Sequence, residues 1–314
     1  MEFFPYCQDF EAQTVEHWNR VLFADTLTVQ KFRKQALFDD NFDPALCDVA
    51  LEGNRVTGFI LGTKRQFPYL ERGLEPERGW INVLFVDAAY QGRGVGSRLL
   101  EQAEKKLAGR GALEITWGAY SPNYFFPGID VETYPKAKAF FEHHGYVAGE
   151  EAFSMRADLH GFRIPGSTLA KKSEAEKSGY RFMNFDYRYA LELLEFAKTE
   201  FGGGWKRNVL VSMQNGLAGD CILLAFNKAG RIAGFCMRMI DGNPMRFGPI
   251  GVGAAERNAG LGGILLDLQM FEMSRRGIYQ MYFVSTDLPG RRFYERHGVS
   301  VFRTFTGYKK GITA

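Results

Sequence analysis

The chain has 314 residues, of which 46% are hydrophobic and 24% are charged. This length is typical of about two domains, and the composition is that of a globular protein, which excludes a fibrous or disordered chain. The net charge of +3 is too small, in a chain of this size, to indicate a nucleic-acid-binding surface.

The N-terminal segment MEFFPYCQDFEA has no basic start, long apolar run or small-residue cleavage site, so it does not resemble a signal peptide. No stretch approaches the roughly 18 uninterrupted apolar residues of a membrane-spanning helix. The four cysteines are far apart and have no histidine at metal-ligand spacing, which favours reduced thiols and no metal site. We therefore predict a cytoplasmic protein whose partners are neither a membrane nor a nucleic acid.

The first half of the chain begins with a predicted helix at 13–22 and a hairpin of two strands, 48–51 and 56–61. Gly53 and Asn54, between these strands, tolerate the positive φ that hairpin turns need. An apolar strand follows and leads into a glycine-rich turn, in the segment INVLFVDAAYQGRGVG at 81–96.

An amphipathic helix follows this turn, because Val95, Leu99, Ala103 and Leu107 recur at every fourth position before Gly109. A short strand at 113–117, a second helix at 137–146 (AKAFFEHHGY) and a final strand complete this half. The order of elements is therefore helix, hairpin, strand, helix, strand, helix and strand.

Residues 158–178 lack periodicity and are rich in Lys, Ser and Gly, which predicts a linker. The same series then returns, with a helix at 187–201, strands at 221–226 and 231–239, and the segment FGPIGVGAAERNAGLG at 247–262. The turns lie 166 positions apart (260 − 94) and the last helices 153 apart (298 − 145), so the first half has 13 extra residues. We predict an α/β fold with a mixed sheet in two tandem domains, 1–157 and 179–314.

Each glycine-rich turn joins a strand to a helix, where small residues let backbone N–H groups approach a ligand. The free amides of a helix's first turn, at the positive end of its dipole, favour a phosphate group. Neither turn fits the dinucleotide motif G-x-G-x-x-G, since position 97 is Ser and position 265 is Leu, and neither has the Gly-Lys-Ser/Thr of a Walker loop. Tight helix packing is an alternative reason for such glycines, but it does not explain why the whole context is repeated.

With Gln or Arg, two residues, Gly, one residue and Gly after a strand, both halves resemble the GCN5-related N-acetyltransferase (GNAT) family in tandem. The resemblance implies acetyl-CoA as cofactor, its pyrophosphate on the turn and its pantetheine arm along the preceding strand. In the first half it implicates Leu84, Phe85, Val86, Gln91, Gly92, Arg93, Gly94, Val95, Gly96 and Ser97. In the second half it implicates Ile250, Gly251, Val252, Arg257, Asn258, Ala259, Gly260, Leu261, Gly262 and Gly263.

The resemblance also implies a tyrosine in the last helix that protonates the leaving thiolate. Tyr294 holds this place in the second half, whereas the first half has Phe141, which cannot donate a proton. Tyr134, seven residues before Phe141, is the candidate substitute. For both tyrosines the alternative is a ring packed in the core. No general base is assigned, and water can serve instead.

The 13 extra residues of the first half include an aromatic stretch beside the expected thioester site. We expect Tyr124, Phe125, Phe126 and Asp130 to bind the acceptor, while the alternative is that the rings pack the two halves together. The predicted function is an acetyl-CoA-dependent N-acetyltransferase that moves an acetyl group directly to a primary amine of a small molecule or a protein, in a ternary complex. The alternative is a silent protein that binds or senses acetyl-CoA. The sequence leaves open the acceptor, the active half and the choice between monomer and homodimer.

Overall fold

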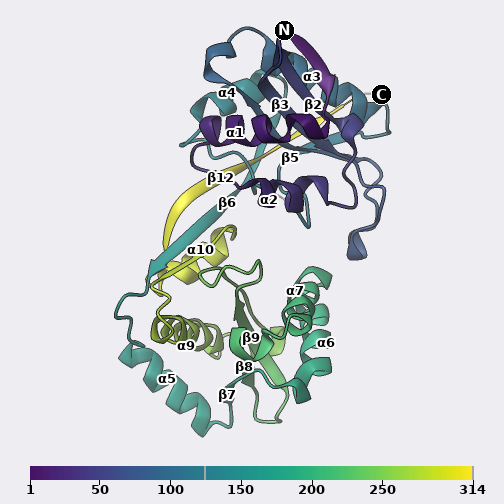
Figure 1. Cartoon of the computed structure of the whole chain (residues 1–314). Coiled ribbons are helices and arrows are strands. Elements are labelled where there is room, and N and C mark those ends of the chain that lie inside the picture. Colours follow the sequence, from purple (N-terminus) through teal and green to yellow (C-terminus); the bar gives the residue numbers. More distant parts are fainter. Residues whose placement is uncertain (124, 313–314) are drawn as a thin grey trace. The chain divides into compact units, whose positions relative to one another are not determined.

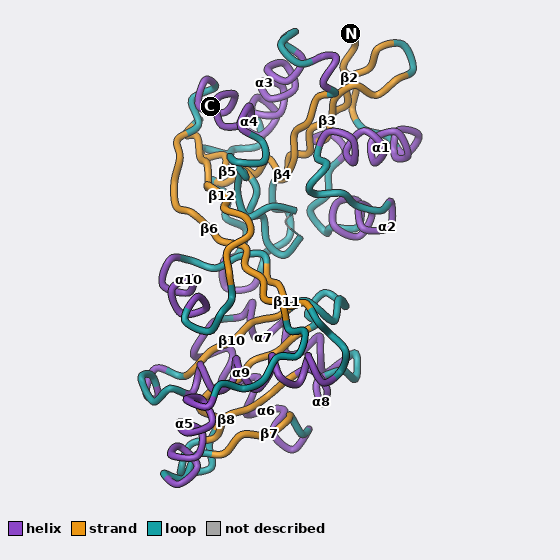
Figure 2. The backbone as a smooth tube through the Cα atoms, turned by 90° about the vertical axis from the view of Figure 1, so that its left-hand side faces the viewer, coloured by secondary structure: helices purple, strands orange, loops and turns teal. Residues whose placement is uncertain are grey.

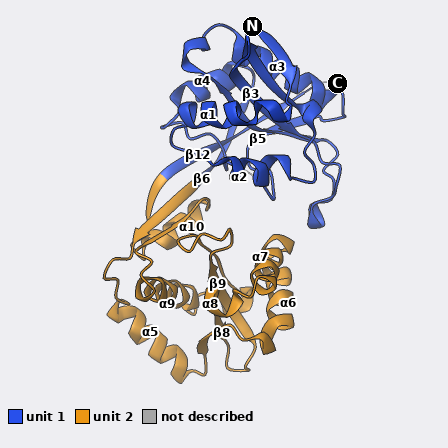
Figure 3. Ribbon diagram, viewed as in Figure 1, with its two compact units in different colours: residues 1–152, 303–314 blue, residues 153–302 orange. Residues whose placement is uncertain are grey.

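The computed structural model describes residues 1–123 and 125–312. The chain forms two compact units (Figure 3): unit 1 comprises Met1–Ala152 with the C-terminal segment from Arg303, and unit 2 comprises Phe153–Phe302. The predicted domain boundaries differ from these units in three respects. Residues 153–157, predicted in the first domain, belong to unit 2. The predicted linker contains a helix, α5 (Gly166–Lys177), and the end of the chain belongs to unit 1.

Unit 1 is built on a mixed sheet, as predicted. Its strands lie in the order β1 (Glu2–Pro5), β2 (Cys47–Glu52), β3 (Arg55–Thr63), β4 (Arg78–Val86), β5 (Glu114–Trp117) and β12 (Ser300–Gly311). All neighbours are antiparallel except β4 and β5, which are parallel. The predicted hairpin corresponds to β2 and β3, and the strand before the glycine-rich turn is β4.

Helices cover both faces of this sheet (Figure 2). One face carries α1 (Glu11–Val21) and α2 (Val29–Phe32), and the other carries α3 (Val95–Ala108) and α4 (Pro135–His143). Successive side chains of a strand point to opposite faces. Accordingly Phe59 of β3 belongs to an aromatic core with Trp18 and Phe32, whereas Ile60 packs with Leu99 and Leu107 of α3.

Unit 2 repeats this plan (Figure 1). Its antiparallel sheet has the order β10 (Phe247–Val252), β9 (Ile232–Arg238), β8 (Ile222–Phe226) and β7 (Arg181–Asn184). One core includes α9 (Leu261–Arg275) and α10 (Leu288–Glu295), and the other includes α6 (Ala190–Phe201), α7 (Gly203–Gln214) and α8 (Ala218–Cys221). Within the described part of the chain, no helix combines the length and hydropathy needed to cross a membrane.

The last strand of each half runs into the other unit. β6 (Val147–Asp158) begins in unit 1, but its residues Met155–Asp158 pair with β11 (Gln280–Phe283) of unit 2. β12 begins in unit 2, but Tyr308–Gly311 pair with β5 of unit 1. Unit 1 is therefore completed by the C-terminal strand of the chain.

Candidate functional site

The glycine-rich turn of unit 1 joins β4 to α3 through a short 3-10 helix, η5 (Ala88–Tyr90). Gly92 and Gly94 have φ of +72° and +79°, in the left-handed region that glycine enters without strain. Gly94 is the N-cap of α3, so the N–H groups of the following turn have no intrahelical partner. A Cβ on Gly92 or Gly94 would meet no atom within 4 Å, so the outer side of the turn is open to an anion.

The second copy of the turn has the same backbone conformation at the matching positions. Asn258 has φ of +69° and Gly260 has φ of +74°, and α9 begins directly afterwards. Asparagine is one of the few residues besides glycine that enter this region readily. The repeat in the sequence is therefore also a repeat of local geometry.

Two side chains of unit 1 hold its turn. Gln91 Nε2 donates to the Val86 carbonyl at 3.0 Å, which ties the turn to the end of β4. Ser97 Oγ lies 2.9 Å from His144 Nε2, and His144 Nδ1 lies 2.7 Å from the Phe140 carbonyl. Because a carbonyl only accepts, we assign the imidazole proton to Nδ1, so that Ser97 donates to Nε2. The histidine thus contacts the first turn of α3.

β4 offers a free backbone edge beside the turn. It pairs with β3 from Trp80 to Val86, but with β5 only from Arg78 to Ile81. β5 ends at Trp117, so residues 83–86 have no strand partner on this side within the described part of the chain. Such an edge is able to hold an extended ligand by backbone hydrogen bonds, which is the role predicted for Leu84, Phe85 and Val86.

One cavity of about 600 Å³ adjoins the turn and this free edge, a size suited to a small molecule. Eight of the first-half residues predicted to bind the cofactor line this cavity, namely Leu84, Phe85, Val86, Gln91, Gly92, Gly94, Gly96 and Ser97. The other two lie outside it, since Val95 is buried and the exposed Arg93 has its guanidinium 5.5 Å from the centre of the Tyr90 ring. Further lining comes from α1, the segment before α4, and β12, through Val21, Leu22, Phe126, Gly128, Ile129, Asp130, Thr133, Tyr134 and Phe305.

Tyr134 brings a phenol to this cavity. Its Oη donates to Asp25 Oδ2 at 2.8 Å and accepts from the Ala24 backbone N–H at 3.3 Å. Burial, together with the Asp25 carboxylate, raises the pKa of Tyr134. The phenol therefore keeps its proton at neutral pH, which a proton donor requires.

Asp130 also lines the cavity, but it is paired with a cation. Its Oδ2 lies 2.6 Å from Arg303 Nε and accepts from Thr133 Oγ1 at 2.7 Å. Burial raises the pKa of Asp130, but the Thr133 N–H and the Arg303 guanidinium outweigh it, so the net shift is downward. The same guanidinium binds both carboxylate oxygens of Asp25, at 2.5 and 2.8 Å.

The aromatic stretch before α4 divides between the cavity and the core. Phe126 is 7% exposed, lines the cavity and stacks on Trp18 with ring centres 6.1 Å apart. Phe125 packs on the same indole at 4.9 Å. Both rings thus contact a residue of unit 1. Tyr124 lies outside the described residues.

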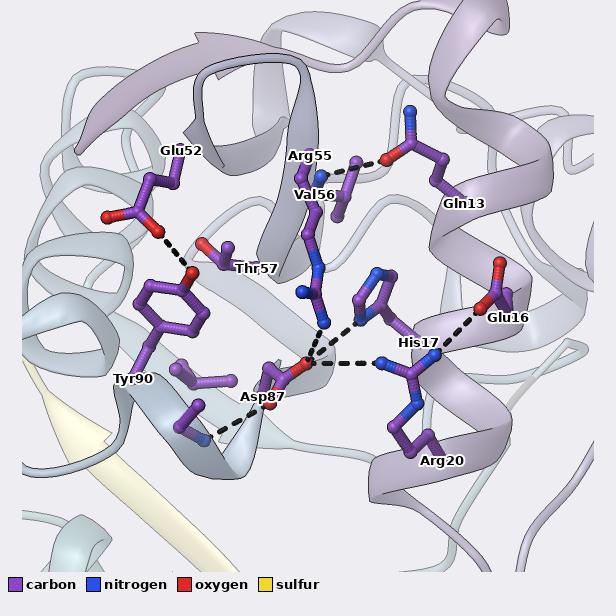
Figure 4. Close-up of polar contacts among 12 residues, drawn as sticks. Gln13, Glu16, His17, Arg20, Glu52, Arg55, Val56, Thr57, Asp87 and Tyr90 are labelled. Atoms are coloured by element: carbon purple, nitrogen blue, oxygen red, sulfur yellow. Dashed lines mark hydrogen bonds and ion pairs between the residues drawn. The ribbon is translucent and has the colours of Figure 1, made fainter.

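A cluster of polar contacts around the buried Asp87 carboxylate lies at the end of β4 (Figure 4). Asp87 Oδ2 lies 3.2 Å from Arg55 Nη2, 3.3 Å from His17 Nδ1 and 3.4 Å from Arg20 Nη1, and Asp87 Oδ1 accepts from the Ala89 N–H. Burial raises the pKa of Asp87, but the Ala89 N–H and the positive charges of the neighbouring basic groups, which include Arg55 and Arg20, outweigh it and lower the pKa. Burial also lowers the pKa of His17, with Arg20 acting in the same direction. The imidazole is therefore neutral at pH 7.

Unit 2 builds the matching strand differently. Gly251 stands where unit 1 has Phe85, and a Cβ on Gly251 would lie 2.4 Å from the Phe201 ring and 2.8 Å from the Trp205 ring. These rings stack on each other at 4.3 Å and cover the strand at this point. Ile250 and Val252 pack toward the core that contains α9.

The remaining second-half predictions lie at the start of α9 and in the core. Arg257, Asn258, Ala259 and Gly260 are exposed, Leu261 is buried, and Gly262 and Gly263 lie beside the rings of Phe293 and His297. Tyr294 is 9% exposed, and its ring centre lies 4.4 Å from that of Phe283 and 6.3 Å from that of Phe247. Burial raises the pKa of Tyr294. Its counterpart Phe141 lines the cavity of unit 1.

Sequence reasoning did not identify several residues of the cavity and its surroundings. Asp25, Arg303 and Phe305 come from a loop and from the far end of the chain, and no local motif marks them. The Asp87 cluster was missed for the same reason, since its members come from three separate elements. In residues 1–123 and 125–312, no group of three or more His, Cys, Asp or Glu side chains is placed to hold a metal ion.

A comparison of the sequence with models of protein families gives a match to the acetyltransferase (GNAT) family over residues 7–125. This range contains α1, the hairpin, β4, the glycine-rich turn and α3 of unit 1. No curated protein matches the sequence.

Several solved structures share the fold of the whole chain. A GCN5-related glucosamine N-acetyltransferase region of a fungal multi-domain GH3 β-N-acetylglucosaminidase is 20% identical, with a TM-score of 0.79. The match covers 98% of this chain but only 38% of that longer protein. A GCN5-related N-acetyltransferase from Sphaerobacter thermophilus is 15% identical (TM-score 0.72), with 100% of this chain and 96% of the other covered. A tandem GNAT protein from the clavulanic acid biosynthesis pathway is 16% identical (TM-score 0.66), with 100% and 99% covered.

Proposed function

Because the model of the acetyltransferase (GNAT) family matches residues 7–125 and the whole chain shares the fold of a tandem GNAT protein, we propose that unit 1 binds acetyl-CoA and transfers its acetyl group to a primary amine. One observation carries this proposal: a single cavity joins the open glycine-rich turn, the free edge of β4 and the protonated phenol of Tyr134. These are the three features that pyrophosphate binding, pantetheine binding and protonation of a thiolate require.

Different residues of unit 1 have different roles in the proposed reaction. The N–H groups of the turn and of the start of α3 hold the pyrophosphate, and the edge of β4 orients the thioester and polarises its carbonyl. The neutral amine nitrogen attacks the carbonyl carbon, and the C–S bond breaks in the tetrahedral adduct. Tyr134 gives its proton to the leaving sulfur, the excess proton on nitrogen passes to water, and the Tyr134 phenolate takes up a proton from water, so that the phenol is restored. The products are an amide and CoA with a free thiol.

Unit 2 has a supporting role in this proposal. Phe201 and Trp205 cover β10 at Gly251, and Tyr294 is enclosed by aromatic rings. The buried phenol is therefore assigned to packing, and the site predicted in the second half is not proposed to turn over substrate.

Calorimetry with acetyl-CoA tests the assignment, with Gly94→Glu and Gly260→Glu as a matched pair. The two glycines have nearly equal positive φ and open space around the position of a Cβ, so both substitutions impose the same backbone strain. We expect one site per chain, lost in Gly94→Glu and retained in Gly260→Glu, because a carboxylate on the turn repels the pyrophosphate. Binding that only Gly260→Glu removes would assign the cofactor to unit 2 instead.

The acceptor is sought by measuring CoA release with a panel of primary amines. Glucosamine is the first probe, because one structural neighbour is described as a glucosamine N-acetyltransferase region, and it is compared with a polyamine and a peptide N-terminus. Release above background with one of them supports catalysis. A chain that binds acetyl-CoA tightly and releases no CoA with any amine would instead be a binding or sensing protein.

A further inference from the structure

The segment of unit 1 that ends at Tyr134 is docked on the C-terminal strand β12. Ile129 and Thr306 exchange both backbone hydrogen bonds, each 2.8 Å long. Gly128 lies so close to the strand that a Cβ there would be 2.5 Å from the Thr306 carbonyl oxygen. Directly beside this bridge, Arg303 binds Asp130. The last strand of the chain therefore forms part of the support of the cavity.

One guanidinium reaches both ends of the segment 130–134. At the first end, Asp130 accepts from the Thr133 N–H at 2.9 Å and from Arg303 Nε at 2.6 Å. At the other end, Tyr134 donates to Asp25, whose two oxygens receive the Nη1 and Nη2 groups of Arg303. The Arg303 side chain is only 16% exposed, so water competes weakly for these contacts.

Asp25 is itself held from a second direction. The Trp18 indole Nε1 donates to the Asp25 backbone carbonyl at 2.8 Å, and the Trp18 ring stacks on Phe126 of the cavity wall. With its backbone and its carboxylate both bound, Asp25 gives the Tyr134 phenol a fixed acceptor. Arg303 also opposes the rise in the pKa of Tyr134 that burial and Asp25 cause.

This arrangement needs arginine in particular. The planar guanidinium presents Nε and both Nη groups in a fixed fork, so it can bind one carboxylate through two nitrogens and a second through the third. A lysine in its place has a single ammonium group and cannot reproduce this double contact. With neither an arginine nor a lysine at position 303, the carboxylates of Asp25 and Asp130 would lose the positive charge that they share.

Building on the function proposed for unit 1, we propose that Arg303 is a positioning residue that holds Tyr134 in the cavity through Asp25 and Asp130, so that acetyl transfer by unit 1 depends on the last strand of the chain. The sequence assigns this arginine to the second half, 169 positions after Tyr134 (303 − 134). The structure makes it part of the first unit's site.

Hydrogen exchange, which needs no substrate, tests whether Arg303 holds the segment 130–134 in place. In Arg303→Lys, we expect the amides of residues 130–134 to exchange roughly tenfold faster, while those of α3 stay as in the wild type. The matched control is Lys309→Met, which removes an exposed ion pair with Glu114 from the same strand and is expected to change neither region. Unchanged exchange at 130–134 in Arg303→Lys overturns the proposal. Asp25→Asn, which keeps the shape of the side chain, gives the same test if the arginine variant folds poorly.

A kinetic cycle tests whether Arg303 acts through Tyr134. We expect Arg303→Lys to lower kcat about 10- to 100-fold with the Kd of acetyl-CoA, measured by calorimetry, changed by less than about twofold. The double variant Arg303→Lys/Tyr134→Phe should be no slower than Tyr134→Phe alone, because both changes remove the same proton donation. Multiplying losses in the double variant would overturn the positioning role. If the wild type turns over no amine at all, the proposed function fails, and the exchange experiment still decides whether Arg303 holds the segment.

Discussion

Units 1 and 2 repeat the same strand, turn and helix, but they supply the aromatic rings beneath that strand from different elements. In unit 1 the ring comes from the strand, since Phe85 packs 5.6 Å from Phe59 and 6.1 Å from Trp18. In unit 2 the strand has Gly251, and Phe201 and Trp205 supply the rings from α6 and α7. The turn geometry is therefore independent of how the core beneath it is built, and the presence of a turn does not by itself tell which half binds a ligand.

The ends of the two strands are also anchored differently. In unit 1, Asp87 accepts from the Ala89 N–H and gathers three basic groups around it. In unit 2 the matching position is Gly253, and a carboxylate from α6 lies at the end of the strand instead, since Glu200 Oε2 accepts from the Ala254 N–H at 2.7 Å. This N–H is one position earlier than the counterpart of Ala89. Both units thus place a carboxylate on a backbone N–H just after the strand, but only in unit 1 is this carboxylate buried and surrounded by basic groups.

The largest stability effect is expected from removing the strand ring of unit 1. Phe85→Ala should lower the free energy of unfolding of unit 1 by about 3–5 kcal/mol, because it leaves a cavity in an aromatic core. Hydrogen exchange of β3 and α3, compared with that of α9, measures this loss unit by unit. Gly251→Ala is the reciprocal change and should destabilise unit 2 by about 1–3 kcal/mol through overpacking against Phe201. A neutral Phe85→Ala would mean that the two units do not differ in this way.

The next effect concerns catalysis. With an amine that is turned over, Tyr134→Phe should lower kcat about 100-fold, equivalent to about 2.7 kcal/mol, since the leaving thiolate loses its proton donor. Tyr294→Phe should leave kcat near the wild-type value, because the phenol of Tyr294 is buried in unit 2. The ratio of the two rates therefore compares the units directly, and a larger loss in Tyr294→Phe would move the chemistry to unit 2.

Local patterns in the sequence were sufficient for most elements of both units. The apolar stripe of Val95, Leu99, Ala103 and Leu107 predicts α3, and all four side chains are buried. The fixed spacing of the two turns predicts the repeat, and the positive φ of Gly94 and Gly260 accounts for the small residues there. These features depend on interactions between residues near each other in the chain, which a sequence pattern reports directly.

The exchange of the final strands could not be predicted in this way. β6 and β12 each follow the last helix of a half, and nothing in their own residues states which sheet each one joins. Pairing of a strand with a distant neighbour is decided by tertiary packing. For the same reason Arg303 gave no signal, since its partners Asp25 and Asp130 lie 278 and 173 positions away. The predicted turn residues could be found from spacing, whereas the support of the Tyr134 segment could not.

A smaller effect is expected from the anchors of the strand ends. Asp87→Asn should destabilise unit 1 by about 2 kcal/mol at pH 7, because the buried carboxylate is replaced by a group that cannot balance Arg20 and Arg55. Glu200→Gln, which alters the carboxylate anchor of unit 2, should cost less than about 1 kcal/mol because an amide oxygen still accepts from Ala254. Chemical denaturation, monitored by hydrogen exchange in each unit, measures the loss of stability in both variants. Equal losses would remove the distinction between the two anchors.

The smallest effect is a pH dependence that arises from one buried histidine of unit 1. His17 is buried beside Arg20, Arg55, Asp87 and Glu16, and its pKa is lowered in the folded state by burial first and by Arg20 next. As the pH falls below about 6.5, the unfolded chain takes up a proton on this histidine before the folded chain does, so stability is lost toward acid pH by up to about 1.4 kcal/mol per pH unit. We expect the free energy of unfolding of unit 1 to fall more steeply between about pH 7 and pH 5 in the wild type than in His17→Gln.

The other four histidines are present in both proteins, so their contributions cancel in this difference. The pKa of Asp87 is also lowered, so its contribution is lost only below about pH 4, outside the window that reports on His17. Identical slopes in the two proteins would mean that the imidazole titrates alike in the folded and unfolded states, and the burial of His17 in unit 1 would then have no effect on the pH dependence of stability.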